Sequence, residues 1–168
     1  MNSKRTLICV VAAAAAVALA QSAASGQGLV SAKRLSASLA AELVMATVEA
    51  CAQKSYRVGV VVLDTSGVQQ AALRGDGAAP QNVLNAFDKA YTAVSFGTDT
   101  AELVERSKTG TVSSAFAKLP HLLLNAGGVV IKVGDEVIGA IGVSGAPGGD
   151  NDVVCAKAAL EKIKDRMK

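Results

Sequence analysis

The chain has 168 residues, of which 51% are hydrophobic and 18% charged, and its formal net charge is +3 at pH 7. This length suits one domain with a buried core, and the composition excludes an intrinsically disordered protein. Lys4 and Arg5 precede the first apolar run, and without them 15 of the 17 basic residues remain against 14 acidic ones. Because this balance leaves almost no basic excess and only 3% of residues are aromatic, no nucleic-acid partner is expected.

Residues 1–24 have the layout of a secretory signal peptide. A basic start leads into an apolar run of about 14 residues, from Leu7 to Ala20, and small residues follow it. The run is short for a bilayer span, although an uncleaved membrane anchor is the alternative. Cleavage is expected after Ala20 or Ala24. The domain over residues 25–168 is expected to be periplasmic or secreted, with no membrane association.

Hydrophobic periodicity divides this domain into helices and strands. Leu35, Leu39 and Leu43 repeat at helical spacing, whereas the segment at residues 57–63 is continuously apolar and rich in valine, as in a buried strand. The elements predicted in chain order are a helix at residues 31–55, strands at 57–63 and 68–73, a helix from Pro80 to Val94, a shorter helix at 100–107, an irregular loop at 108–118, strands at 122–124, 129–133 and 136–143, and a helix at 153–163.

The order of these elements predicts one α/β domain without repeats or long linkers. Gly127-Gly128 and Gly134-Asp135 form short turns between the last three strands, and short turns imply antiparallel neighbours. A single-domain αβα sandwich satisfies the order, with a five-stranded antiparallel sheet and helices on both faces.

Two cysteines of the expected mature domain lie at helix ends. Cys51 is near the end of the first helix and Cys155 near the start of the last one. If these helices run antiparallel on one face of the sheet, the two ends meet and a disulfide can form in an oxidising compartment. Such a bridge, closing about a hundred residues, would stabilise the fold by roughly 4 kcal/mol. The alternative is a pair of small buried thiols.

The glycine-rich stretch from Gly139 to Asp152, GAIGVSGAPGGDND, allows three interpretations. A nucleophile elbow requires G-x-S-x-G, and Ala146 stands where the last glycine belongs. The spacing also differs from a dinucleotide-binding G-x-G-x-x-G. We therefore interpret the stretch as a strand turning into a helix that Asp150 and Asp152 cap.

Four segments carry a resemblance to a known family. They are LRGDGAAPQ, DKAYTAVSF, LPHLLLNAGGVVIKVGDEVIGAIG and VIGAIGVSGAPGGDNDVVCAKAAL, which lie in this order along the chain. Together they resemble the GlcG/HbpS-type heme-binding family. The resemblance implies a profilin-like αβα sandwich with an antiparallel sheet, assembly into homo-oligomers, and binding of heme or a related tetrapyrrole. It implies no established reaction.

A bound heme needs an apolar slot, an axial donor for iron and cations for two propionates. His121, the only imidazole, is the first candidate donor, and the others are Tyr91, Thr109 and Thr111. Arg74 and Lys89 are the candidate partners of the propionates, because they lie in or beside the RGDGA and KAYTA segments. Lys118 is a third choice. Each has a structural alternative: a surface histidine, a core tyrosine, polar loop threonines and ordinary surface charges.

The sequence thus points to an exported heme- or tetrapyrrole-binding protein that acts as a sensor, buffer or carrier without catalysis. The alternative is a small-metabolite-binding accessory module of a catabolic pathway or of an envelope sensor. An enzyme that uses Asp76, Asp88 or His121 in acid–base chemistry is a third possibility, but the sequence offers no convincing catalytic pair at readable spacing.

Overall fold

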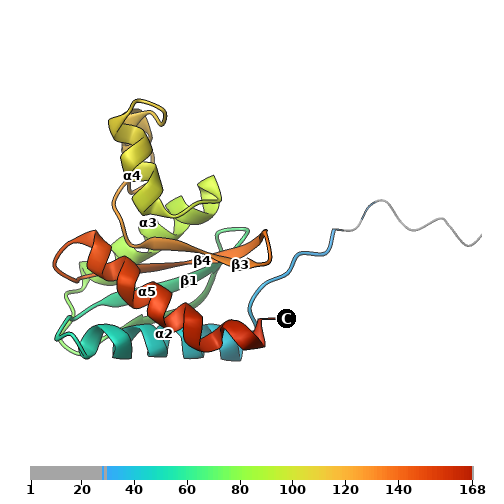
Figure 1. The fold of residues 1–168 in the computed structure, drawn as a ribbon, viewed down its shortest axis with the longest axis vertical. Coiled ribbons are helices and arrows are strands. Elements are labelled where there is room, and N and C mark those ends of the chain that lie inside the picture. Colours follow the sequence, from blue (N-terminus) through green and yellow to red (C-terminus); the bar gives the residue numbers. More distant parts are fainter. Residues whose placement is uncertain (1–27, 29, 168) are drawn as a thin grey trace, which may run out of the picture. The chain divides into compact units, whose positions relative to one another are not determined.

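The computed structural model describes residues 28 and 30–167, and the predicted signal peptide lies outside them. Ala32–Lys168 forms one compact unit. No helix in the described part of the chain is both long and apolar enough to span a membrane. The elements, coloured along the sequence in Figure 1, are α2 (Ala37–Ala52), β1 (Gly59–Asp64), β2 (Gln69–Arg74), α3 (Gln81–Phe96), α4 (Thr100–Lys108), the 3-10 helix η2 (Ser114–Lys118), β3 (Gly128–Val133), β4 (Glu136–Ser144), α5 (Gly149–Ile163) and the 3-10 helix η3 (Lys164–Arg166).

The sheet has four antiparallel strands in the order β2-β1-β4-β3. Strand β1 lies in the centre, where Val61 pairs with Ala72 of β2 on one side and with Gly142 of β4 on the other. All six residues of β1 are buried, which explains its continuous run of apolar residues. The antiparallel sheet is confirmed.

The prediction of a fifth strand is wrong, because residues 122–124 form no strand. The Leu123 N–H donates to Thr92 Oγ1 of α3 at 2.7 Å instead of to a neighbouring strand. The start of α4 covers the outer edge of β3, where side-chain oxygens of Thr100 and Asp99 accept from the N–H groups of Gly128 and Val130 at 2.9 and 3.0 Å. These bonds occupy edge positions that another strand would need.

Helices cover both faces of the sheet, as predicted. One core contains Val60, Val62 and Ile141 and packs against α2 and α5, which lie side by side in Figure 1. The other contains Val61 and Leu63 and packs against α3. Because successive side chains of a strand point to opposite faces, the unbroken valine run of β1 supplies both cores.

Helix α3 lies very close to the sheet, and small residues make this approach possible. Its sheet-facing positions Ala86, Ala90 and Ala93 are fully buried. A Cβ at Gly142 of β4 would overlap the carbonyl oxygen of Ala86. Part of the glycine-rich stretch is therefore explained by helix packing.

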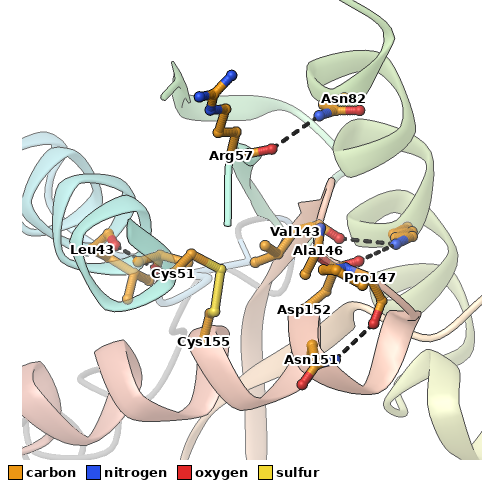
Figure 2. The surroundings of a disulfide bond; sticks show 12 residues. Leu43, Cys51, Arg57, Asn82, Val143, Ala146, Pro147, Asn151, Asp152 and Cys155 are labelled. Atoms are coloured by element: carbon orange, nitrogen blue, oxygen red, sulfur yellow. Dashed lines mark hydrogen bonds and ion pairs between the residues drawn. A yellow bond between two sulfur atoms is a disulfide. The ribbon is translucent and has the colours of Figure 1, made fainter. Parts of the chain in front are cut away.

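The predicted disulfide is present between Cys51 and Cys155. The two Cα atoms are 5.4 Å apart, and the bond joins residues separated by 104 positions. Both cysteines are fully buried. Figure 2 shows the bond connecting the last turn of α2 with the beginning of α5.

Two boundaries and one loop differ from the prediction. Helix α2 begins at Ala37, where Ser36 caps it by accepting from the Leu39 N–H, and α5 begins at Gly149 instead of Val153. The segment predicted as an irregular loop contains η2.

Candidate functional site

An aromatic cluster lies on one flank of α3, where Phe87 and Tyr91 are partly buried against the core between this helix and the sheet. The rings of Phe87 and Tyr91, one helical turn apart, are stacked with centroids 5.9 Å apart. The His121 ring meets Phe87 edge-on at 5.6 Å and Tyr91 at 5.9 Å. The structure thus brings together two of the residues that the sequence singled out, His121 and Tyr91, and adds Phe87.

A carboxylate orients the imidazole of His121. Its Nδ1 lies 3.0 Å from Oδ1 of Asp88, which is also on α3. Among the described residues, no hydrogen bond reaches the other ring nitrogen, Nε2. A histidine whose Nδ1–H donates to a carboxylate presents the Nε2 lone pair as a metal ligand.

The backbone holds His121 in an unusual conformation. Its φ is +61°, a left-handed value that is uncommon for residues other than glycine and that stores strain. Thr92 of α3 fixes the segment on both sides, because its Oγ1 lies 3.5 Å from the His121 carbonyl oxygen and accepts from the Leu123 N–H. The same bonds that prevent a fifth strand therefore set the position of the imidazole.

The cluster continues into an exposed apolar surface. Leu84, one turn before Phe87 on α3, is 68% exposed, and the side chain of His121 is 62% exposed. Leu119, two residues before His121, is exposed as well. We call the surface formed by Leu84, Phe87, Tyr91 and His121 the α3 patch.

Lys89, a predicted propionate partner, is buried on the opposite side of α3. Its side chain is 3% exposed, and Nζ donates to Asp152 Oδ2 at 2.8 Å and to the Val143 carbonyl at 3.0 Å. The ammonium group is fully engaged inside the protein, so it is not available at the α3 patch.

Asp152 serves this ion pair and does not cap α5. Its other oxygen, Oδ1, accepts from the Ala146 N–H at 3.0 Å, as Figure 2 shows, and the cap position of α5 is Gly148, which makes no side-chain cap bond. Asp152 is 2% exposed. Burial raises the pKa of its carboxyl, and the hydrogen bond from Lys89 opposes this rise.

The other three candidate residues lie elsewhere. Arg74 is exposed at the end of β2. Thr109 and Thr111 are exposed at the end of α4 that points away from the sheet in Figure 1, with their hydroxyl oxygens 3.1 Å apart. Within residues 28 and 30–167, no hydrogen bond or ion pair connects these three to the α3 patch.

Asp88 is the residue whose role at this site the sequence did not reveal. It lies 33 positions before His121, and the return of the chain from η2 to α3 brings the two together. A signal was present in the helical spacing of Leu84, Phe87, Asp88 and Tyr91, which places all four on one side of α3.

The side chains of the α3 patch suit a ligand that already contains a metal ion. In the part of the chain that the structure describes, no three His, Cys, Asp or Glu side chains gather to hold a metal ion. The α3 patch instead offers one oriented imidazole beside aromatic rings, and a heme requires from the protein one axial donor and apolar contact.

The comparison with known proteins establishes the family to which this chain belongs. The family model described as haem degrading protein HbpS-like matches residues 35–161. The chain belongs to the HbpS-like family. The resemblance inferred from the four sequence segments is therefore confirmed.

Curated and solved relatives of this HbpS-like protein agree in sequence and in fold. Protein GlcG of Escherichia coli K12 is 34% identical over 110 residues, which cover 66% of this chain and 81% of GlcG. A crystal structure of a double mutant of Streptomyces reticuli HbpS is 35% identical with a TM-score of 0.76, and the match covers 84% of this chain and 94% of that one. A crystal structure of a PduOC:heme complex is 26% identical with a TM-score of 0.71, covering 77% of this chain and 94% of that one.

Proposed function

We propose that this HbpS-like protein binds heme or a closely related tetrapyrrole at the α3 patch. The observation that carries the proposal is the Asp88–His121 pair, which holds one imidazole among aromatic rings on an exposed surface. The likeness to a solved heme complex supports the choice of ligand. We further propose a sensor, buffer or carrier that performs no catalysis.

Each residue of the patch has a part in this binding. His121 offers Nε2 to the iron, and Asp88 keeps the proton on Nδ1. Phe87 and Tyr91 supply aromatic surface for the macrocycle. When bound, heme supplies an iron centre that can change its oxidation state. With Lys89 enclosed in the core and Arg74 at the end of β2, Lys118 remains as the candidate cation for the propionates.

The exposure of the patch predicts exchangeable binding. Because the imidazole is 62% exposed, the protein alone encloses little of a bound macrocycle. We therefore expect a Kd in the micromolar range, about 8 kcal/mol of binding free energy, as suits a protein that passes its ligand on. We also propose a homo-oligomer in which a second copy covers the patch.

Export is part of the proposal. The disulfide between Cys51 and Cys155 supports it, because buried structural disulfides persist in oxidising compartments and are rare in the cytosol. Residues 1–24 have the composition of a signal peptide. We place the mature protein in a periplasm or outside the cell.

The test is a titration of the exported protein with hemin, followed in the Soret region. A saturable new band is expected, lost in His121→Ala and weakened about tenfold in affinity in Asp88→Asn, because the second variant disturbs only the orientation of the ligand. Thr111→Ala is the matched control and should titrate like the wild type. Loss of the band in Thr111→Ala alone would indicate that the heme binds at the end of α4 and not at the α3 patch. A titration without a new band would refute heme binding.

A further inference from the structure

We propose that the protein has a second ligand site, which takes an amphipathic carboxylate, in a cavity beside the core that α2 and α5 cover. The cavity measures about 390 Å³ and lies where the chain entering α2, the β3–β4 hairpin and the C-terminal η3 meet. Its volume is within the range of pockets that bind small molecules. The residues that carry the argument are Arg34, Leu35, Leu39, Val133, Ile138 and Met167.

The floor of this cavity is apolar and continuous with the main core. Leu35 and Ile138 are each 4% exposed and belong to the core between the sheet and helices α2 and α5. Leu39, Val133 and Met167 are partly buried and pack against the same core. A hydrocarbon chain or ring inserted here would exchange water for aliphatic contacts, at about 25 cal/mol for each Å² removed from water.

The charged side chains that line the cavity are all cations. Lys33, Arg34 and Arg166 line it, and no aspartate or glutamate does. Lys33 Nζ is 2.6 Å from Glu136 and Arg166 Nη1 is 2.7 Å from Glu42, so two of the three cations already have carboxylate partners. Arg34 forms no ion pair within the described residues. Its guanidinium is always charged and matches the geometry of a carboxylate.

These two features define the ligand class. An apolar floor beside one uncommitted guanidinium fits a molecule with a hydrocarbon body and one carboxylate at its end, and disfavours highly charged or fully polar metabolites. The site shares no residue with the α3 patch, so it does not depend on the proposed heme binding.

Decanoate is a suitable probe, with decanol as the matched neutral molecule of the same chain length. Calorimetric titration of the exported protein should show saturable binding of one decanoate per chain. In NMR spectra, the amide shifts that decanoate causes should concentrate at Leu35, Ile138 and Met167. Decanol should bind much more weakly, because it gives Arg34 no charge to neutralise.

Two variants and one control localise the binding. Arg34→Gln should weaken decanoate binding about tenfold, which corresponds to the loss of one charge-assisted hydrogen bond. Leu39→Trp should abolish binding by filling the cavity, with circular dichroism confirming that the variant is folded. Arg57→Gln removes an exposed arginine outside the cavity and should bind like the wild type.

The outcomes separate this site from the proposed function. No saturable binding, equal binding of decanol, or unchanged affinity in Arg34→Gln would overturn the inference even if hemin binds normally. Displacement of bound hemin by decanoate would also overturn it, because the cavity would then be the tetrapyrrole site itself. Decanoate binding that persists in His121→Ala would support a second site, whatever the result with hemin.

Discussion

The buried pair of Lys89 and Asp152 shows how much can depend on single residues in this fold. The pair connects the middle of α3 to the first turn of α5, and Asp152 also accepts a hydrogen bond from the Ala146 N–H in the turn between β4 and α5. Both side chains are almost completely removed from water. Each charge is therefore tolerated only because the other is present.

Removing one charge should destabilise the protein strongly. Asp152→Asn leaves the ammonium of Lys89 buried without a counter-charge, so the free energy of unfolding at pH 7, measured with urea, should fall by about 3–5 kcal/mol. Asp150→Asn changes an exposed aspartate of the same helical turn and should alter the free energy of unfolding by less than about 0.5 kcal/mol. Similar losses in both variants would show that charge at the start of α5 matters and the ion pair does not.

The same pair predicts a pH dependence with a definite sign. Burial already raises the pKa of Asp152 above the ordinary value of an aspartate, and Lys89→Met removes the cation that opposes this rise. A carboxyl whose pKa is raised by folding contributes stability at pH values below its unfolded pKa, and this stability is lost as the pH rises through the folded pKa. The loss of unfolding free energy in Lys89→Met, relative to the wild type, should therefore be smaller near pH 4 than at pH 7.

Urea denaturation of both proteins across this pH range provides the measurement. Lys118→Met, which removes an exposed cation at the end of η2, is the control and should show no such trend. If Lys89→Met lowered the free energy of unfolding by the same amount at every pH, removal of Lys89 would leave the titration of Asp152 unchanged, and the prediction would be wrong.

The candidate site was only partly predictable at the scale of residues. His121 could be singled out because it is the only imidazole, and Tyr91 because its family segment was recognisable. Asp88 and Lys89 are neighbours on one helix, yet one reaches the surface imidazole and the other enters the core. Their roles depend on residues 33 and 63 positions away, which no local pattern reveals.

The packing of α3 on β4 is the contact between elements that tolerates the least change. In Gly142→Ala the new methyl group would overlap a backbone oxygen of Ala86, which cannot rotate away. We expect a loss of at least about 2 kcal/mol of unfolding free energy. Gly134→Ala is the comparison, because this turn has open space and only a positive φ of 61°, so about 1 kcal/mol is expected. Equal losses would mean that α3 can shift outward without cost.

The disulfide makes α2 and α5 one unit. It closes a loop between residues separated by 104 positions, and the chain-entropy model gives about 4.7 kcal/mol for such a loop. The double variant Cys51→Ala/Cys155→Ala should lose roughly this amount in urea denaturation. Wild-type protein reduced while unfolded should refold to the same lower stability, whereas the reductant should not affect the variant. A double variant as stable as the oxidised wild type would show that packing alone joins these helices.

Elements were predictable where their signal was local. The helical spacing of leucines and the valine run of β1 gave α2 and the central strand correctly. Residues 122–124 are as apolar as a strand, but their backbone bonds to Thr92 of α3 instead. The side chains that occupy the β3 edge come from the start of α4. The number of strands therefore depends on tertiary contacts, which the hydrophobic periodicity of the sequence does not reveal.

For the whole molecule, the two sides of the sheet are covered by different numbers of helices. On one side α2 and α5 cover the core, whereas on the other α3 covers it and carries exposed Leu84 beside the partly buried aromatic cluster. An apolar surface at this place is typical of an interface. Since the α3 patch is largely apolar, it suits a two-fold contact between identical chains.

Leu84→Glu tests this contact directly. It places a charge in the proposed interface, so sedimentation velocity of the protein without residues 1–24 should show a shift from oligomer to monomer. Circular dichroism should be unchanged because Leu84 is 68% exposed. Val154→Glu places the same charge at an exposed valine of α5 and should leave the oligomer intact. Dissociation in Val154→Glu alone would move the interface to the side of α2 and α5. If the α3 patch is both interface and heme site, Leu84→Glu should also weaken hemin binding, because a monomer encloses the macrocycle on one side only.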